Sequence, residues 1–246
     1  MDISLNKYIS GTGFCSRREA DQYIEQGRVT INAKVAVKGN RVQEGDEVRV
    51  DGEKLKAVKS AVYILLNKPK GITCTTDLKD KTNVIDFINF KSRIFPVGRL
   101  DKRSEGLLFL TNDGDIVNKI LRAGNKHEKE YVVSVDKDIT PAFIQKMRTG
   151  VRILGTVTKS CFVKQESNDR FRIILIQGMN RQIRRMCEAL GYNVKSLLRT
   201  RIMNITVSGL PPGKWRYFTP DEIRIINTMV STSSKTDEPE NGGMDE

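Results

Sequence analysis

The stretch FPVGRLDKRSEGLLFLTNDG, residues 95–114, carries the pattern on which the fold prediction depends. It completes a short apolar segment, residues 93–97, that we expect to form a strand. A second strand is predicted to begin at Gly106 and to continue through residues 107–110. Asp101 therefore lies in a charged loop between two predicted strands.

Basic residues surround Asp101 in this loop, with Arg99 before it and Lys102 and Arg103 after it. Positive charge nearby favours the ionised form of a carboxyl group. An ionised carboxylate can attack a carbon atom or remove a proton. The spacing alone nevertheless favours a structural role, in which the aspartate caps a turn and pairs with a neighbouring arginine. The loop by itself leaves both interpretations open.

The pattern of apolar residues away from this loop predicts further strands and helices. Strands are expected at residues 63–66, 131–135, 171–176 and 194–198. Helices are expected to begin at Thr140-Pro141, near Asn180 and at Thr219-Pro220-Asp221-Glu222, with Gly150 ending the first of them. Because several strands follow one another through short turns, we predict an α+β fold with a mixed, largely antiparallel sheet.

The first sixty residues resemble a separate small module of α+β type. Ser16 and Glu19 form a predicted capping box at the start of a helix that ends at Gly27. Strands are expected at 29–31 and 47–50, followed by a polar linker at 51–60. The predicted division is therefore residues 1–59 and 60–230, with a disordered acidic tail at 231–246.

The net charge of +12 is spread unevenly along the chain. Residues 60–226 hold 30 Lys and Arg against 16 Asp and Glu, whereas residues 1–59 hold 11 against 9. The last twenty residues hold one lysine and five acidic residues. A long basic region attracts polyanions, so a nucleic-acid partner is expected.

Several other classes of protein are disfavoured by composition. The four cysteines are widely spaced and the chain has a single histidine, which argues against a zinc site and a disulfide framework. No run of about 18 apolar residues and no signal segment is evident. We therefore expect a soluble cytoplasmic protein that uses no metal.

Two further segments carry candidate site residues. Tyr131 stands near the start of a predicted strand, where its ring could stack on a base, although core packing explains the same position. In GMNRQIRRM, residues 178–186, a helix would place Arg181, Arg184 and Arg185 opposite an apolar stripe. The arginine fork suits a carboxylate or a phosphate, but a solvated basic helix face is also common.

Basic residues in the small module could hold an RNA backbone without reading its sequence. Two of them lie in the first turn of the predicted helix, where backbone donors also favour phosphate. Ordinary surface charge is the alternative. The candidates are Lys7, Arg17, Arg18 and Arg28.

Taken together, these segments resemble a known enzyme family over residues 3 to about 226. The opening LNKYISGTGFCSRREADQYIEQGRVTINAKV resembles the S4 RNA-binding module. The remainder resembles the catalytic domain of the ribosomal pseudouridine synthases of the RsuA/RluB/RluE/RluF group, because LNKPKG, GRLD, KEY and RQIRRM occur in the order of that family. LRAGNKHEKEYVVSVDKDIT and RTRIMNITVSGLPPGKWR are most similar to the RluF type of large-subunit enzymes.

This resemblance implies that the protein isomerises uridine to pseudouridine in 23S ribosomal RNA and needs no cofactor. It implies that Asp101 is the catalytic aspartate, Tyr131 the active-site tyrosine and Arg184 the arginine that pairs with the aspartate. RNA would be bound by the four residues of the small module and by Arg99, Lys102, Arg181 and Arg185. We expect a monomer, because no apolar stripe is left for self-association.

Two alternatives remain open from the sequence. The same chemistry could act on 16S ribosomal RNA or on a tRNA anticodon stem-loop. A non-catalytic ribosome-associated protein with an S4 module is the other alternative, but it leaves the ordered motifs of residues 60–226 unexplained.

Overall fold

The computed structural model describes residues 2–56 and 60–233. The chain divides into two compact units. Unit 1 is Met1–Val62 with the short segments Phe90–Ile94 and Asn112–Gly114, and unit 2 is the rest of the chain. Each unit is described by itself below.

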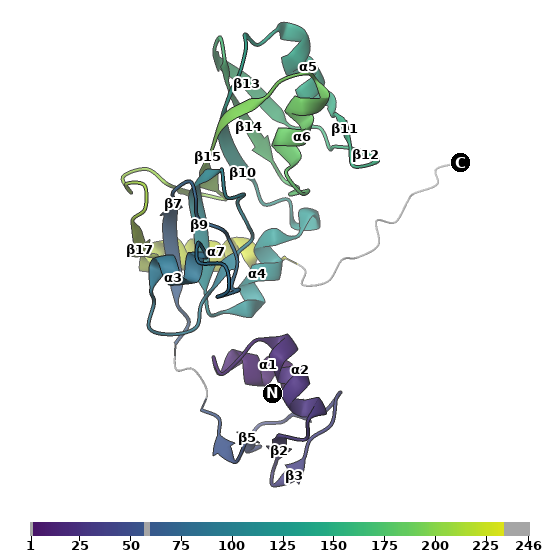
Figure 1. Ribbon diagram of the computed structural model, residues 1–246, viewed down its shortest axis with the longest axis vertical. Coiled ribbons are helices and arrows are strands. Elements are labelled where there is room, and N and C mark those ends of the chain that lie inside the picture. The colour runs from purple at the N-terminus through teal and green to yellow at the C-terminus, as the bar shows by residue number, and fades with distance from the viewer. Residues whose placement is uncertain (1, 57–59, 234–246) are drawn as a thin grey trace, which may run out of the picture. The chain divides into compact units, whose positions relative to one another are not determined.

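Unit 1 contains two short helices and small sheets (Figure 1). A four-stranded sheet has the order β3-β2-β5-β6, and β1 pairs with β4. Leu5, Ile9, Ala20 and Ile24 of the helices contribute to its buried core. The elements are β1 (Ile3–Ser4), α1 (Leu5–Gly11), α2 (Arg17–Glu25), β2 (Val29–Ile31), β3 (Lys34–Val35), β4 (Arg41–Val42), β5 (Val48–Val50) and β6 (Glu53–Lys54).

Local signals in unit 1 match most of the predictions. The capping box forms, because the Glu19 amide donates to Ser16 Oγ at 3.2 Å and the Ser16 amide donates to Glu19 Oε2 at 2.7 Å. The predicted linker at 51–60 is wrong in its first part. Asp51 and Gly52 have positive φ and turn the chain into β6, which pairs with β5. Residues 57–59 of that linker lie outside the described part of the chain.

Unit 2 is built on one sheet of nine strands with the order β13-β14-β10-β15-β9-β7-β17, and β16 and β8 pair with β15 and β9 (Figure 1). Every pair is antiparallel except β15 with β9. This arrangement confirms the predicted α+β fold with a mixed, largely antiparallel sheet. The strands are β7 (Tyr63–Lys68), β8 (Phe95–Val97), β9 (Glu105–Thr111), β10 (Lys129–Val135), β13 (Phe162–Ser167), β14 (Arg170–Leu175), β15 (Val194–Ile202), β16 (Ile205–Thr206) and β17 (Trp215–Tyr217).

The helices of unit 2 cover two parts of this sheet. α5 and α6 pack with β10, β13, β14 and β15 in one buried core, and α4 and α7 pack with β7 and β9 in another. A short hairpin formed by β11 and β12 adds Ile153 to the first of these cores. The remaining elements are α3 (Val84–Ile88), α4 (Gly114–Leu121), η1 (Ala123–Asn125), α5 (Pro141–Thr149), β11 (Arg152–Ile153), β12 (Thr156–Val157), α6 (Gln182–Ala189) and α7 (Pro220–Val230).

The ends of these helices show where sequence patterns succeed and where they do not. Thr140 caps α5 and Thr219 caps α7, as predicted. The helix predicted from Asn180 begins two residues later, because Arg181 has a left-handed backbone with φ 50°. Residues 231–233 of the predicted tail are described, and the hydroxyl of Ser233 lies 2.9 Å from His127 Nε2. Residues 234–246 lie outside the described chain.

Gly106 is required where β9 meets β15. Its φ is +107°, and a Cβ there would lie 2.3 Å from the carbonyl oxygen of Arg199. We expect Gly106→Ala to reduce the free energy of unfolding by about 3 kcal/mol or more, since backbone strain and overpacking add. Chemical denaturation measures this loss. Gly209→Ala is the matched control, because Gly209 has φ +75° but open space around it. Equal stability of the Gly106 variant and the wild type would contradict the close approach.

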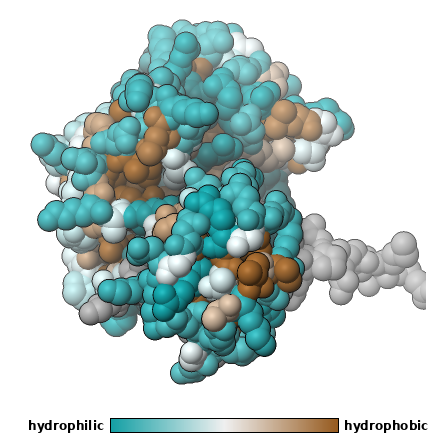
Figure 2. Space-filling model, turned by 60° about the horizontal axis from the view of Figure 1, so that its bottom comes forward, coloured by the Kyte–Doolittle hydropathy of each residue, from teal (hydrophilic) through white to brown (hydrophobic). Residues whose placement is uncertain are grey.

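The face drawn in Figure 2 is mostly hydrophilic, with hydrophobic residues gathered in a few separate patches. Within the described residues, no helix combines the length and the apolar composition needed to cross a bilayer.

Candidate active site

The loop between β8 and β9 positions Asp101. Gly98 turns the chain after β8 with φ +77°, and the amide of buried Leu100 donates to Cys74 Sγ at 3.4 Å. The Ser104 amide then donates to the Asp101 carbonyl at 2.9 Å. These contacts hold the loop on both sides of Asp101 while its side chain stays 34% exposed. The carboxylate is therefore fixed in place and still accessible.

Arg184 on α6 reaches the Asp101 carboxylate from a site that is almost closed to solvent. Its Nε lies 3.6 Å from Asp101 Oδ2, and its side chain is 9% exposed. One Nη donates to Ser104 Oγ at 3.1 Å and the other to the Val194 carbonyl at 3.3 Å. Arg184 Nε is buried and forms no hydrogen bond, so the contact with Asp101 is an ion pair at slightly more than hydrogen-bond distance.

Burial and charge act in opposite directions on Arg184. Burial lowers the pKa of its guanidinium, and the Asp101 carboxylate partly offsets this effect. The nearby guanidinium of Arg181 also lowers the pKa of Arg184. A buried guanidinium that keeps its charge is stabilised by its anionic partner, which explains why Arg184 turns toward Asp101.

A pocket of about 110 Å³ opens beside this ion pair. Tyr131 of β10 lines it together with Asp101 and Arg184, so the three predicted catalytic residues meet at one cavity. Apolar side chains, two glutamines, two further arginines and a serine complete the walls. The other lining residues are Arg99, Leu100, Ser104, Leu175, Gln177, Gly178, Met179, Arg181, Gln182, Ile183 and Leu197.

The predicted RNA-binding residues of unit 2 separate into two groups. Arg99 and Arg181 line the pocket, and Arg181 Nη1 lies 4.0 Å from Asp101 Oδ2. Lys102 is exposed on the same loop but does not line the pocket. Arg185 also lies outside the lining, where its Nε donates to the Asn180 carbonyl at 3.1 Å. The expected shared polar face of the three arginines is thus wrong, because Arg184 is buried against the Asp101 loop.

In unit 1, the predicted RNA-binding residues have different surroundings. Arg17 and Arg18 are exposed at the start of α2, and Lys7 of α1 is half-buried. Arg28 forms two hydrogen bonds with the Asp51 carboxylate, at 2.7 and 2.6 Å, and its guanidinium lies 4.3 Å from the centre of the Tyr23 ring. This pairing occupies much of the donor capacity of Arg28.

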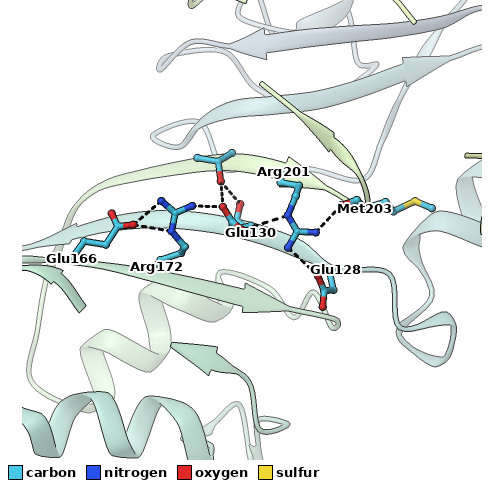
Figure 3. A network of polar contacts seen from close by, with 7 residues as sticks. Glu128, Glu130, Glu166, Arg172, Arg201 and Met203 are labelled. Carbon is cyan, nitrogen blue, oxygen red and sulfur yellow. Dashed lines mark hydrogen bonds and ion pairs between the residues drawn. The ribbon is translucent and has the colours of Figure 1, made fainter. Parts of the chain in front are cut away.

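Glu130, next to Tyr131, is held in a network of ion pairs that spans three strands (Figure 3). Arg172 of β14 and Arg201 of β15 both pair with its carboxylate. Thr200 Oγ1 also donates to Glu130 Oε1 at 2.9 Å. Burial would raise the pKa of Glu130, but these hydrogen bonds and charges lower it overall. The network links β10 to β14 and β15 directly beside Tyr131, at the point where the pairing of β10 with β15 shifts register between Glu130 and Tyr131.

Sequence reasoning missed a set of buried cations in unit 2. Lys68 is fully buried and donates to the carbonyls of Pro69 and Ile72, both at 2.9 Å. Arg199, 4% exposed, donates to the Leu107 carbonyl at 2.7 Å. Burial lowers the pKa of Lys129 to about 8. Their residue types gave no signal, because lysine and arginine are rarely buried.

Ser104 was also missed, although it receives the hydrogen bond from Arg184 and follows Asp101 by three residues. A serine in a polar loop is too common to be singled out without coordinates. Within residues 2–56 and 60–233, no cluster of three or more histidine, cysteine, aspartate or glutamate side chains could hold a metal ion.

Comparison with known proteins assigns two ranges of the chain to known families. Residues 62–189 match the family model described as RNA pseudouridylate synthase, and residues 4–48 match the S4 domain. The first match covers residues 62–189 of the segment 60–226 that a non-catalytic S4 protein would leave unexplained, including the GRLD, KEY and RQIRRM motifs.

Curated relatives match this chain over most of their own length. The chain is 56% identical to the dual-specificity RNA pseudouridine synthase RluF of Escherichia coli over 96% of this chain and 82% of that protein. It is 36% identical to the ribosomal large subunit pseudouridine synthase B of Bacillus subtilis over 92% and 96%, respectively. A crystal structure of a pseudouridylate synthase aligns with a TM-score of 0.66 and 26% identity over 91% of this chain and 99% of that chain.

These relationships extend over both parts of the molecule and agree with its α+β architecture. The predicted pseudouridine synthase resemblance is confirmed, and with it the expectation of an RNA-modifying isomerase. The chain belongs to the RNA pseudouridine synthases that carry an S4 domain, in the group that includes RluF.

Proposed function

We propose that this enzyme converts uridine to pseudouridine in 23S ribosomal RNA with Asp101 as its catalytic carboxylate. The observation that carries the assignment is the ion pair between Asp101 and buried Arg184 at the wall of the pocket that Tyr131 also lines. An aspartate that only caps a turn would not need a buried cation and an open cavity beside it.

The target uridine must first unstack from the neighbouring bases of the RNA before it can enter the pocket, which costs a few kcal/mol. Tyr131 stacks on the extruded base, and Arg99 and Arg181 bind the backbone phosphates around it. The pocket that receives the base is lined by Asp101, Tyr131 and Arg184 together.

Asp101 then starts the reaction by one of two routes. Its oxygen bonds to C1′ as the bond from C1′ to N1 breaks, or it removes the proton from C2′ and the same bond breaks by elimination. In both routes the freed uracil then turns so that its C5 faces C1′. In the first route C5 bonds to C1′ as the bond from C1′ to the Asp101 oxygen breaks, and in the second C5 bonds to C1′ as Asp101 returns the proton to C2′. The C5 proton is finally lost while N1 gains a proton. The reaction needs no oxidant, reductant or second substrate, since substrate and product are isomers.

The RNA target is supported by the relatives. One is described as a large-subunit enzyme and another as a dual-specificity enzyme. The second description favours an additional RNA, and we propose a tRNA anticodon stem-loop or 16S ribosomal RNA as candidates. Purified protein incubated with unmodified 23S, 16S and tRNA transcripts, followed by pseudouridine mapping, tests the assignment. New pseudouridine in 23S RNA supports it, whereas modification of the other RNAs alone overturns the choice of 23S RNA.

We also propose that residues 1–59 act as an RNA-binding domain distinct from the catalytic domain at 60–230. Deleting residues 1–59 is expected to weaken RNA affinity and to reduce its dependence on salt, since fewer phosphates are neutralised. Filter binding at several salt concentrations measures both effects, and circular dichroism reports the fold of the remainder. A truncated protein that is unfolded, or one that binds RNA as tightly as the full chain, would contradict the division of roles.

A further inference from the structure

β17 forms one end of the nine-stranded sheet and displays two aromatic side chains. It pairs with β7 alone, with Trp215 opposite Leu66 and Tyr217 opposite Ile64. Arg216 between them points to the other side of the strand, where it donates to both carboxylate oxygens of Glu222 on α7 at 2.7 and 2.8 Å. Trp215 and Tyr217 therefore share the side of β17 that faces away from α7.

Both rings are accessible to a large planar ligand. Trp215 is 37% exposed and Tyr217 55% exposed, and their ring centroids lie 5.6 Å apart in a T-shaped arrangement. Phe87 of α3, 38% exposed, lies near the turn before β17, because its Cζ is 3.7 Å from where a Cβ of Gly213 would be. Exposed aromatic side chains are thus gathered at this edge of the sheet.

Lysines connect this edge to the catalytic loop. Exposed Lys214 precedes Trp215, and its carbonyl accepts from the Asn67 amide at 3.0 Å. Gly71 follows Asn67 by four residues, and its amide donates to the Lys102 carbonyl at 2.8 Å. The intervening Lys70 is exposed and pairs with Glu105 at 3.5 Å. A five-residue segment spans at most about 17 Å, so Lys214 and Lys102 lie within the reach of a few nucleotides.

We propose that the exposed Trp215 ring, with the Tyr217 ring beside it at a right angle, forms a platform on which an unpaired base of the substrate RNA stacks, next to the nucleotide that enters the pocket. Lys214, Lys70 and Lys102 would contact the phosphates between the two positions. Aromatic rings flanked by cations suit single-stranded nucleic acid, because every base has a face that can stack. The proposal rests on RNA as the substrate and not on the role of Asp101.

Fluorescence of the wild-type protein provides a direct test, since Trp215 is the only tryptophan in the chain. The full-length protein is titrated with a ten-nucleotide oligouridylate and, in parallel, with an abasic oligomer of the same length. We expect the oligouridylate to quench the tryptophan emission and the abasic oligomer to bind without quenching it. If labelled oligouridylate binds by anisotropy while the emission stays unchanged, the platform does not exist.

Substitutions separate stacking from folding. Trp215→Ala is expected to weaken oligouridylate binding about 5-fold or more, and Trp215→Phe to keep most of the affinity because it keeps an aromatic face. Phe162→Ala is the matched control, since Phe162 is 51% exposed on β13 at the opposite end of the sheet order. Thermal melts identify any variant that is partly unfolded, and the wild-type quenching result does not depend on these variants.

Turnover measurements distinguish this proposal from the assignment of Asp101. Trp215→Ala should raise KM for RNA while kcat at saturating RNA stays near that of the wild type, because the reacting groups are untouched. A fall in kcat without a change in KM would overturn the platform. Sedimentation that shows a dimer lost on Trp215→Ala, with RNA binding unchanged, would instead assign this edge to self-association.

Discussion

Asp101→Asn is expected to abolish pseudouridine formation while RNA binding survives. Asparagine has nearly the same size, so the loop contacts of Leu100 and Ser104 should persist. It carries no charge and is neither an effective nucleophile nor a base, so both proposed routes lose their first step. We expect the single-turnover rate to fall by at least about 10³-fold, within the range seen for removal of a general acid or base or of a nucleophile.

Two measurements keep this result interpretable. Filter binding of the same RNA should give a dissociation constant close to that of the wild type, because the phosphate contacts remain. Asp138→Asn is a matched control, since Asp138 is exposed and does not line the pocket. Near-normal turnover by the Asp101 variant would show that another group performs the reaction.

Arg184→Met is expected to cause the second largest loss of activity. Methionine fills much of the space of the arginine side chain but removes the positive charge beside Asp101 and the hydrogen bond to Ser104. The carboxylate is then no longer held in place, and a displacement of about 1 Å can cost about 10²-fold in rate. We expect a fall in kcat of that size or larger, with a smaller change in RNA affinity.

Comparison with two other variants identifies the cause. Arg184→Lys keeps the charge and loses the fork, so an intermediate rate is expected. Arg185→Met removes one arginine from the same helix outside the pocket and should leave kcat within a few-fold of the wild type. If Arg184→Met and Arg185→Met reduced kcat equally, the ion pair with Asp101 would have no special role.

Signals confined to a few residues predicted local structure well. The capping boxes at Ser16 and Thr219 form as expected, because both partners of each box lie within four residues. The sequence patterns did not predict every helix or helix start. α3 is five residues long and was not predicted, and the start of α6 was placed too early because the left-handed conformation of Arg181 has no sequence signature.

The limits of pattern reasoning are clearest at Arg184. Helical periodicity placed it opposite the apolar stripe with Arg181 and Arg185 and left open whether that face was solvated or functional, and only the family resemblance implied its pairing with Asp101; in the structure it is buried. The Asp101 loop packs against α6 and covers this one arginine. Periodicity describes a helix in isolation and cannot say which neighbour, 83 positions away in the chain, will cover part of its polar side.

The sequence by itself determined the family, the α+β architecture, the basic character of the chain and the choice of Asp101, because these depend on ordered motifs and on the alternation of apolar residues. Only the tertiary structure decided that Lys68 and Arg199 are buried, that Ser104 receives a hydrogen bond from Arg184, and that aromatic side chains gather at β17. The physical reason is that each of these depends on contacts between segments far apart in the chain, and local preferences do not encode such contacts.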